Sequence, residues 1–157
     1  MYRFLDYTAQ MYMTAPVRPV DRGTTMRELE ALFRDYDFNA FPVVEDGVLL
    51  GMATKLDFLK NFAFTADRMV PPYEELMRRR VGDVMTTEII SVTPSTRLTR
   101  VLETMVAHRT RSLPVVGADG KLAGIISRED VMRALDDATR SSYPDSEVRP
   151  GASPSRK

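Results

Sequence analysis

The stretch from Gly120 to Asp130, GKLAGIISRED, decides the fold, because the stretch from Gly47 to Asp57, GVLLGMATKLD, repeats its pattern. Both stretches read Gly-x-Leu-x-Gly, and two further apolar residues follow. A hydroxyl residue and a basic residue come next, and an aspartate stands three positions after the hydroxyl. Such a tandem repeat indicates two equivalent structural units and predicts two related sites.

The repeat extends upstream of these stretches. FPVV at 41–44 matches LPVV at 113–116, and Met-Thr at 13–14 matches Met-Thr at 85–86. The offset is 72 residues at the prolines (114 − 42) and 73 at the aspartates (130 − 57). The two copies therefore stay in register over most of their length, apart from a one-residue insertion in the second turn.

The composition excludes several classes of function. Lys+Arg and Asp+Glu both number 22, so the net charge is zero and gives no broad attraction for nucleic acids or acidic membranes. The chain has no cysteine, which excludes disulfides and thiolate chemistry, and its single histidine, His108, gives little support for a metal site or histidine catalysis. No apolar run approaches the length of a membrane span, and the N-terminus is too polar for a secretory signal. We therefore expect a cytoplasmic protein with no metal site.

The hydrophobic spacing predicts the same five elements in each repeat, in the order β-α-β-β-α. In the first repeat they are an extended segment at 17–20, a helix at 26–36 capped by Thr24 or Thr25, strands at 41–44 and 48–53, and a helix at 54–62. In the second repeat they are an extended segment at 89–92, a helix at 98–105, strands at 113–116 and 122–126, and a helix from 127.

We expect an α+β fold in which the two repeats pack sheet to sheet about a pseudo-twofold axis. About fifty residues rarely build a sufficient core alone, so each copy needs the other, and two symmetric clefts remain between them. The expected boundaries are an N-terminal arm at 1–12, the first repeat at 13–62, a partly helical connector at 63–80, the second repeat at 81–138 and a disordered tail at 139–157.

The repeated β-α-β-β-α pattern, the Pro-Val-Val strand and the Gly-x-x-[Ser/Thr]-x-x-Asp element resemble the cystathionine β-synthase (CBS) domain. A tandem pair of these domains is a Bateman module, and the resemblance covers about residues 13–138. It implies binding of an adenosine-containing ligand, namely AMP, ADP, ATP or S-adenosylmethionine, whose presence is reported to an attached or partner protein. It implies no required cofactor, although Mg²⁺ can accompany ATP.

The resemblance also assigns roles to residues. Asp57 and Asp130 would accept hydrogen bonds from the ribose hydroxyls, which suits a carboxylate because it can accept from both at once. The phosphate region would be served by residues at the same two helix starts, where backbone N–H groups favour anions: Thr54, Lys55, Ser127 and Arg128.

The adenine would lie against the first extended segment and the hairpin strands. The segment residues are Val17, Arg18 and Val20 in the first repeat, and Ile89, Ile90 and Val92 in the second. The resemblance further implies that the residues just before the Pro-Val-Val strand touch phosphates across the cleft. These are Asn39 and Ala40, followed by Phe41 and Pro42, and Arg111 and Ser112, followed by Leu113 and Pro114. Because Arg111-Ser112 stands where the first repeat has Asn39-Ala40, we expect the two sites to differ in phosphate affinity.

Two simpler interpretations stay open. The Thr54/Asp57 and Ser127/Asp130 pairs also fit capping boxes, in which the hydroxyl caps a helix and the acid reaches back. The second glycine of each Gly-x-Leu-x-Gly run fits either close strand packing or the approach of a ligand to the backbone.

The sequence favours a regulatory ligand-binding module over two alternatives. An enzyme is poorly supported, because the chain has no nucleophile–base pair, metal cluster or phosphate-binding glycine loop. A pure assembly module would not need both aspartates. We expect a homodimer formed through helix residues, an effector protein still to be identified, and no nucleic-acid or membrane partner. The candidate interface residues are Leu32, Phe33, Met105 and Val106.

Overall fold

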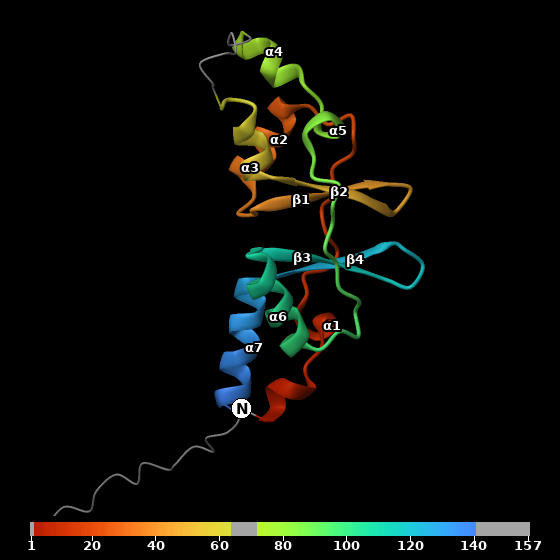
Figure 1. Cartoon of the computed structure of the whole chain (residues 1–157), viewed down its shortest axis with the longest axis vertical. Helices are drawn as coiled ribbons and strands as arrows, with labels where there is room; N and C mark the ends of the chain where they lie inside the picture. The colour runs from red at the N-terminus through yellow and green to blue at the C-terminus, as the bar shows by residue number, and fades with distance from the viewer. Residues whose placement is uncertain (1, 64–71, 141–157) are drawn as a thin grey trace, which may run out of the picture.

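The computed structural model describes residues 2–63 and 72–140, which form two halves stacked along the long axis of the molecule (Figure 1). Each half has a two-stranded antiparallel sheet, and the sheets face each other in the middle with the helices outside them. This arrangement confirms the expected fold class. The sheets pair β1 (Ala40–Glu45) with β2 (Val48–Thr54), and β3 (Ser112–Val116) with β4 (Leu122–Ser127).

The helices divide between the halves in a way that does not follow chain order (Figure 1). The half containing β1 and β2 carries α2 (Met26–Asp35), α3 (Lys55–Lys60), α4 (Tyr73–Arg78) and α5 (Val81–Val84). The half containing β3 and β4 carries the 3₁₀ helix η1 (Tyr2–Asp6), α1 (Ala9–Tyr12), α6 (Leu98–His108) and α7 (Arg128–Arg140). Thr25 caps α2, which confirms one of the two predicted caps.

The predicted first strand of each repeat is reduced to a single parallel bridge. Val20 pairs with Val43, and Val92 pairs with Val115. Pro19, next to Val20, has no N–H group to donate, and proline is disfavoured in a regular ladder. The extended segments therefore line the sheets without becoming full strands.

The chain crosses between the halves at two equivalent points. Thr14 precedes the first repeat's extended segment, yet it exchanges backbone hydrogen bonds of 2.8 and 3.1 Å with Ile125 of β4. Thr86 precedes the second repeat's extended segment and exchanges two bonds of 2.9 Å with Met52 of β2. Each sheet is thus extended at its edge by a segment that continues into the other half.

Gly51 and Gly124 allow these crossing segments to lie close. A Cβ atom on Gly124 would stand 2.7 Å from the Met13 sulfur and 2.8 Å from the Thr14 carbonyl oxygen. A Cβ atom on Gly51 would stand 2.7 Å from the carbonyl oxygen of Thr86. Of the two interpretations of these glycines, the structure confirms close strand packing.

The two hydrophobic cores follow the crossing. The core of the second half includes Phe4 and Ala9 from the N-terminal arm, whereas the core of the first half includes Met77 from the connector and Val81, the first residue of the expected second repeat. The predicted helix in the connector is confirmed as α4. Helix α7 continues to Arg140, two residues into the predicted tail, and the rest of that tail and residues 64–71 lie outside the described residues.

Candidate functional site

Each β-hairpin leads directly into a helix whose first turn contains a buried aspartate. At the start of α3 the Asp57 amide donates to the Thr54 hydroxyl at 3.0 Å. The Thr54 amide and hydroxyl donate in turn to Asp57 Oδ2, at 3.0 and 2.8 Å. The capping-box interpretation is therefore correct for the local structure of this motif.

The second repeat has the same geometry at the start of α7. The Ser127 amide and hydroxyl donate to Asp130 Oδ2 at 2.8 and 2.9 Å, and the Asp130 amide donates to the Ser127 hydroxyl at 3.2 Å. Asp57 and Asp130 are 4% and 5% exposed and are the only charged residues buried within the described part of the chain. In both repeats the cap occupies Oδ2, so any ligand contact depends on what Oδ1 meets.

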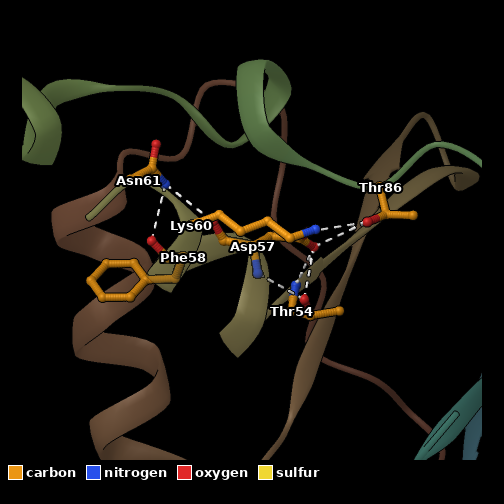
Figure 2. Close-up of polar contacts among 6 residues, drawn as sticks. All are labelled: Thr54, Asp57, Phe58, Lys60, Asn61 and Thr86. Atoms are coloured by element: carbon orange, nitrogen blue, oxygen red, sulfur yellow. Dashed lines mark hydrogen bonds and ion pairs between the residues drawn. The ribbon is translucent and has the colours of Figure 1, made fainter. Parts of the chain in front are cut away.

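Asp57 also contacts a residue of the other repeat, as Figure 2 shows. The Thr86 hydroxyl, on the segment that crosses from the second repeat, donates to Oδ1 and Oδ2 at 3.2 and 3.3 Å. The Lys60 ammonium lies 3.8 Å from Oδ1, which is an ion-pair distance and not a hydrogen bond. The hydrogen-bond donors on the Asp57 carboxylate are therefore the two groups of the cap and the Thr86 hydroxyl.

Asp130 meets a different neighbour. Arg133 donates to Oδ1 at 2.9 Å and also to the Tyr12 carbonyl oxygen at 3.1 Å, which ties the aspartate to the N-terminal arm. The Tyr12 hydroxyl donates to Asp137 at 3.0 Å, and burial together with this bond raises the pKa of the Tyr12 phenol. Among the described residues, the Thr14 hydroxyl makes no hydrogen bond to Asp130, although Thr14 is the repeat counterpart of Thr86. Each aspartate thus accepts from the two groups of its cap and from one further residue, which is Thr86 at Asp57 and Arg133 at Asp130.

A cavity of about 400 Å³ opens beside Asp130, between the two halves. The first repeat contributes two segments to its wall, and the second repeat contributes the β3 entrance, part of β4 and the start of α7. The lining residues are Thr14, Pro16, Val17, Arg18, Tyr36, Asp37, Phe38, Asn39, Ala40, Phe41, Pro42, Arg111, Ser112, Ile125, Ser127, Glu129 and Asp130.

One wall of the cavity is an aromatic stack capped by an arginine. The rings of Tyr36 and Phe38 are nearly parallel, at 12° with 5.7 Å between centroids. The Arg18 guanidinium lies 5.2 Å from the Tyr36 centroid and donates to the Tyr36 hydroxyl at 3.0 Å. Phe41, fully buried behind them, packs its ring against both Tyr36 and Phe38. A flat aromatic or heterocyclic group is the kind of ligand that such a wall stacks against.

The charged lining is mixed and slightly acidic. Arg18 and Arg111 face three carboxylates, those of Asp37, Glu129 and Asp130. Two arginines suit a ligand with one phosphate group better than a ligand with three phosphate groups. Each phosphate added in ADP and ATP brings further negative charge that needs its own cations.

Two predicted phosphate contacts do not line this cavity. Arg128 Nε donates to the Thr110 carbonyl oxygen at 3.0 Å and lines a separate groove, while the Lys55 ammonium lies 5.9 Å from the Phe33 ring centroid. Arg111 donates to Asn39 at 3.4 Å, and both line the same cavity. Asn39 and Arg111 were expected to distinguish the phosphate affinities of two different sites, but in this structure both belong to the Asp130 cavity.

The structure gathers half of the predicted site residues into the cavity. Those that line it are Val17, Arg18, Asn39, Ala40, Phe41, Pro42, Arg111, Ser112, Ser127 and Asp130. Those that do not are Thr54, Lys55 and Asp57 around α3, Ile89 and Ile90 on the second extended segment, Arg128 at the groove, and the buried Val20, Val92, Leu113 and Pro114.

Sequence reasoning missed several residues of the cavity and its surroundings. Thr14 and Thr86 carried a usable signal, because the Met-Thr pair recurs in both repeats. Tyr36 ends the helix predicted at 26–36, and this position alone gives no sign of a ligand contact. Phe38 carries no pattern because it lies after the helix end. The contact of Arg133 with Asp130 is one helical turn away, but nothing in the sequence distinguishes it from an ordinary surface pair.

A second, more apolar hollow lies between α6 and α7, with a volume of about 360 Å³. Val106 and Met132 on its rim are 69% and 68% exposed. Of the residues expected at a dimer interface, Met105 also lines this hollow, but it is 2% exposed and packs in the second core, whereas Val106 is open to contact.

Within residues 2–63 and 72–140, the helices are too short or too polar to cross a membrane. The same residues contain no group of three or more histidine, aspartate or glutamate side chains that could hold a metal ion.

Comparison with known proteins agrees with this architecture. The CBS domain family matches the chain at residues 9–63 and 81–137. YhcV, a CBS domain-containing protein of Bacillus subtilis, is 34% identical over 120 residues, covering 76% of this chain and 79% of YhcV. The chain belongs to the CBS domain family as a tandem pair of domains.

Solved structures show the same fold. The crystal structure of CBSX2 in complex with AMP superposes with a TM-score of 0.73 at 29% identity, covering 85% of this chain and 99% of CBSX2. MJ1225 of Methanocaldococcus jannaschii has a TM-score of 0.77 at 24% identity, which is a likeness of fold alone. The chain spans 48% of the MJ1225 structure.

Proposed function

We propose that this chain is a regulatory module that binds an adenosine nucleotide in the cavity beside Asp130. The observation that carries the proposal is the position of Asp130, whose buried carboxylate lines a cavity that also contains an aromatic wall and two arginines. A carboxylate suits ribose hydroxyls, a stack suits a purine and an arginine suits a phosphate. The likeness to CBSX2, which is solved with AMP, supports the same ligand class.

The charge balance of the lining favours AMP over ADP and ATP. Arg18 and Arg111 are outnumbered by three carboxylates, and neither Arg128 nor Lys55 adds charge to this cavity. S-adenosylmethionine, which carries no phosphate, would fit the acidic side of the lining. Mg²⁺ would enter only with ATP, to offset its phosphates.

A thermal-shift and calorimetric panel tests the proposal with AMP, ADP, ATP, S-adenosylmethionine and GTP, each with and without Mg²⁺. At equal ligand concentrations we expect AMP to stabilise the chain most. At a hundredfold excess of AMP over its Kd the gain in unfolding free energy should be about 2.7 kcal/mol. Asp130→Asn should abolish most of that shift, because the amide keeps one oxygen for the helix cap but loses the charge. The absence of a shift from every nucleotide, with the chain folded, would sink the proposal.

Transmission of the bound state requires a second surface, and we place it at the hollow between α6 and α7. Its exposed Val106 and Met132 suit an apolar contact with a second copy of the chain, and a further effector protein would sense the dimer. A ligand can change such an assembly only if it binds the two arrangements unequally. We assign no catalytic step to this module.

Val106→Glu tests the dimer. A charge placed on the rim of the apolar hollow should raise the dimer dissociation constant by about tenfold or more, because the carboxylate must be desolvated in the contact. Sedimentation equilibrium measures that constant. Glu103→Gln on α6, outside the hollow, is the control and should leave it unchanged. Equal association of wild type and Val106→Glu would place the interface elsewhere.

A further inference from the structure

The two aspartates have the same cap but different neighbours, although the sequence repeat predicts two related sites. The Thr86 hydroxyl lies on the Asp57 carboxylate at 3.2 and 3.3 Å, where a ribose hydroxyl would have to donate (Figure 2). The same segment is fixed by two backbone bonds of 2.9 Å to Met52, so Thr86 is held in place by the sheet. The Lys60 ammonium lies 3.8 Å from Oδ1, the oxygen on which Thr86 makes its shorter bond.

The wall that would hold a purine also has no counterpart at Asp57. Applying the 72-residue offset shows what stands at each equivalent position. The residues Arg18, Tyr36, Asp37 and Phe38 of the Asp130 cavity correspond to Ile90, His108, Arg109 and Thr110. The stacked pair of rings and its arginine are thus replaced by an imidazole, a hydroxyl and an aliphatic residue, while Asp37 is replaced by an arginine.

The two helix starts also differ in one neighbouring residue and in helix length. Glu129 lines the cavity, and its counterpart at the start of α3, with the 73-residue offset, is Leu56, which is 62% exposed. In addition α3 has 6 residues, whereas α7 has 13, so fewer aligned peptide dipoles support an anion at its start.

We infer that the chain binds one nucleotide, at Asp130, and that Asp57 has become a structural group satisfied by Thr86. This inference rests on the proposed function and adds its stoichiometry and specificity. Asp57 then joins α3 to the crossing segment of the second repeat, while Asp130 lines the cavity that carries the aromatic wall. The Tyr36–Phe38 stack is the feature that selects between the two sites.

Isothermal titration calorimetry with AMP as the probe tests the inference on the wild type and four variants. Wild type should bind one AMP per chain. Asp130→Asn should weaken AMP binding about ten- to hundredfold, since it removes a charge-assisted acceptor. Asp57→Asn should lower the melting temperature with and without AMP, because the Thr86 contact weakens, yet still bind one AMP per chain with its affinity within about twofold of wild type.

Phe38→Leu provides a variant that does not depend on a helix cap. Phe38 is 40% exposed, so its truncation should leave the fold intact while weakening AMP binding about tenfold through lost stacking. Its matched control is Thr110→Ser, at the equivalent position of the second repeat, which keeps the hydroxyl bond to the Ser112 carbonyl. Thr110→Ser should bind AMP as wild type does.

The outcomes separate the inference from the proposed function. Two AMP molecules per chain, or an equal loss in Asp57→Asn and Asp130→Asn, would overturn the one-site inference and leave nucleotide binding standing. Loss of AMP binding in Asp57→Asn with none in Asp130→Asn would place the nucleotide site at Asp57 and overturn the inference. No binding of any nucleotide to folded wild type would overturn both.

Discussion

Replacing Gly124 with alanine lowers the free energy of unfolding by about 1–3 kcal/mol, because the new methyl group overpacks the crossing point of the two halves. Its Cβ would stand 2.8 Å from the carbonyl oxygen of Thr14. That oxygen cannot move freely, since it accepts a hydrogen bond of 3.1 Å from the Ile125 amide. Urea unfolding followed by circular dichroism measures the loss.

The control is Gly23→Ala, where a Cβ would meet only the end of the Asp21 side chain at 3.2 Å. That side chain can turn away, so this change should stay within about 0.5 kcal/mol. Gly51→Ala should behave like Gly124→Ala, because its Cβ would stand 2.7 Å from the Thr86 carbonyl oxygen. Wild-type stability in both Gly51→Ala and Gly124→Ala would contradict the close packing of the crossing segments.

Phe41→Ala should cost about 3–5 kcal/mol of stability and also weaken nucleotide binding. Phe41 is fully buried, and its ring lies 5.2 Å from Phe33, 5.7 Å from Phe38 and 6.3 Å from Tyr36. Removing it leaves a void directly behind the aromatic wall, so the wall loses its support as well as its packing energy. Denaturant unfolding and AMP calorimetry at low temperature give the two readouts.

Leu29→Ala separates these two effects. Leu29 is fully buried in the same core but does not line the cavity, so its truncation should cost about 2–5 kcal/mol while leaving the AMP dissociation constant unchanged. A Phe41→Ala variant that is destabilised yet binds AMP as tightly as Leu29→Ala would show that the wall does not depend on Phe41.

Much of the fold could be predicted from the sequence, because the repeat reports the same elements twice. The hairpins and the helices that follow them came from local signals, namely alternating apolar residues, turn glycines and capping hydroxyls. The crossing of the N-terminal arm and the connector could not be predicted. Which half Ala9 or Met77 packs against is decided by contacts far apart in sequence, and both segments are apolar enough for either core.

The candidate site was only half predictable, for a physical reason. Each motif identifies a residue type at one helix start, but the cavity is assembled from both repeats, so residues of the first repeat meet the aspartate of the second. The sequence repeat predicts two related sites that differ in phosphate affinity. The differences between them come from side chains outside the motifs, such as Phe38, and from the contact of Thr86 with Asp57.

The central claim is that the cavity at Asp130 is the nucleotide site, and the most direct measurement is a crystal structure of the chain grown with AMP. We expect one AMP per chain, with its ribose hydroxyls in hydrogen-bonding distance of Asp130, its base on the Tyr36–Phe38 stack, and the Thr86 hydroxyl still on Asp57. AMP bound at Asp57, or at both aspartates, would contradict this account.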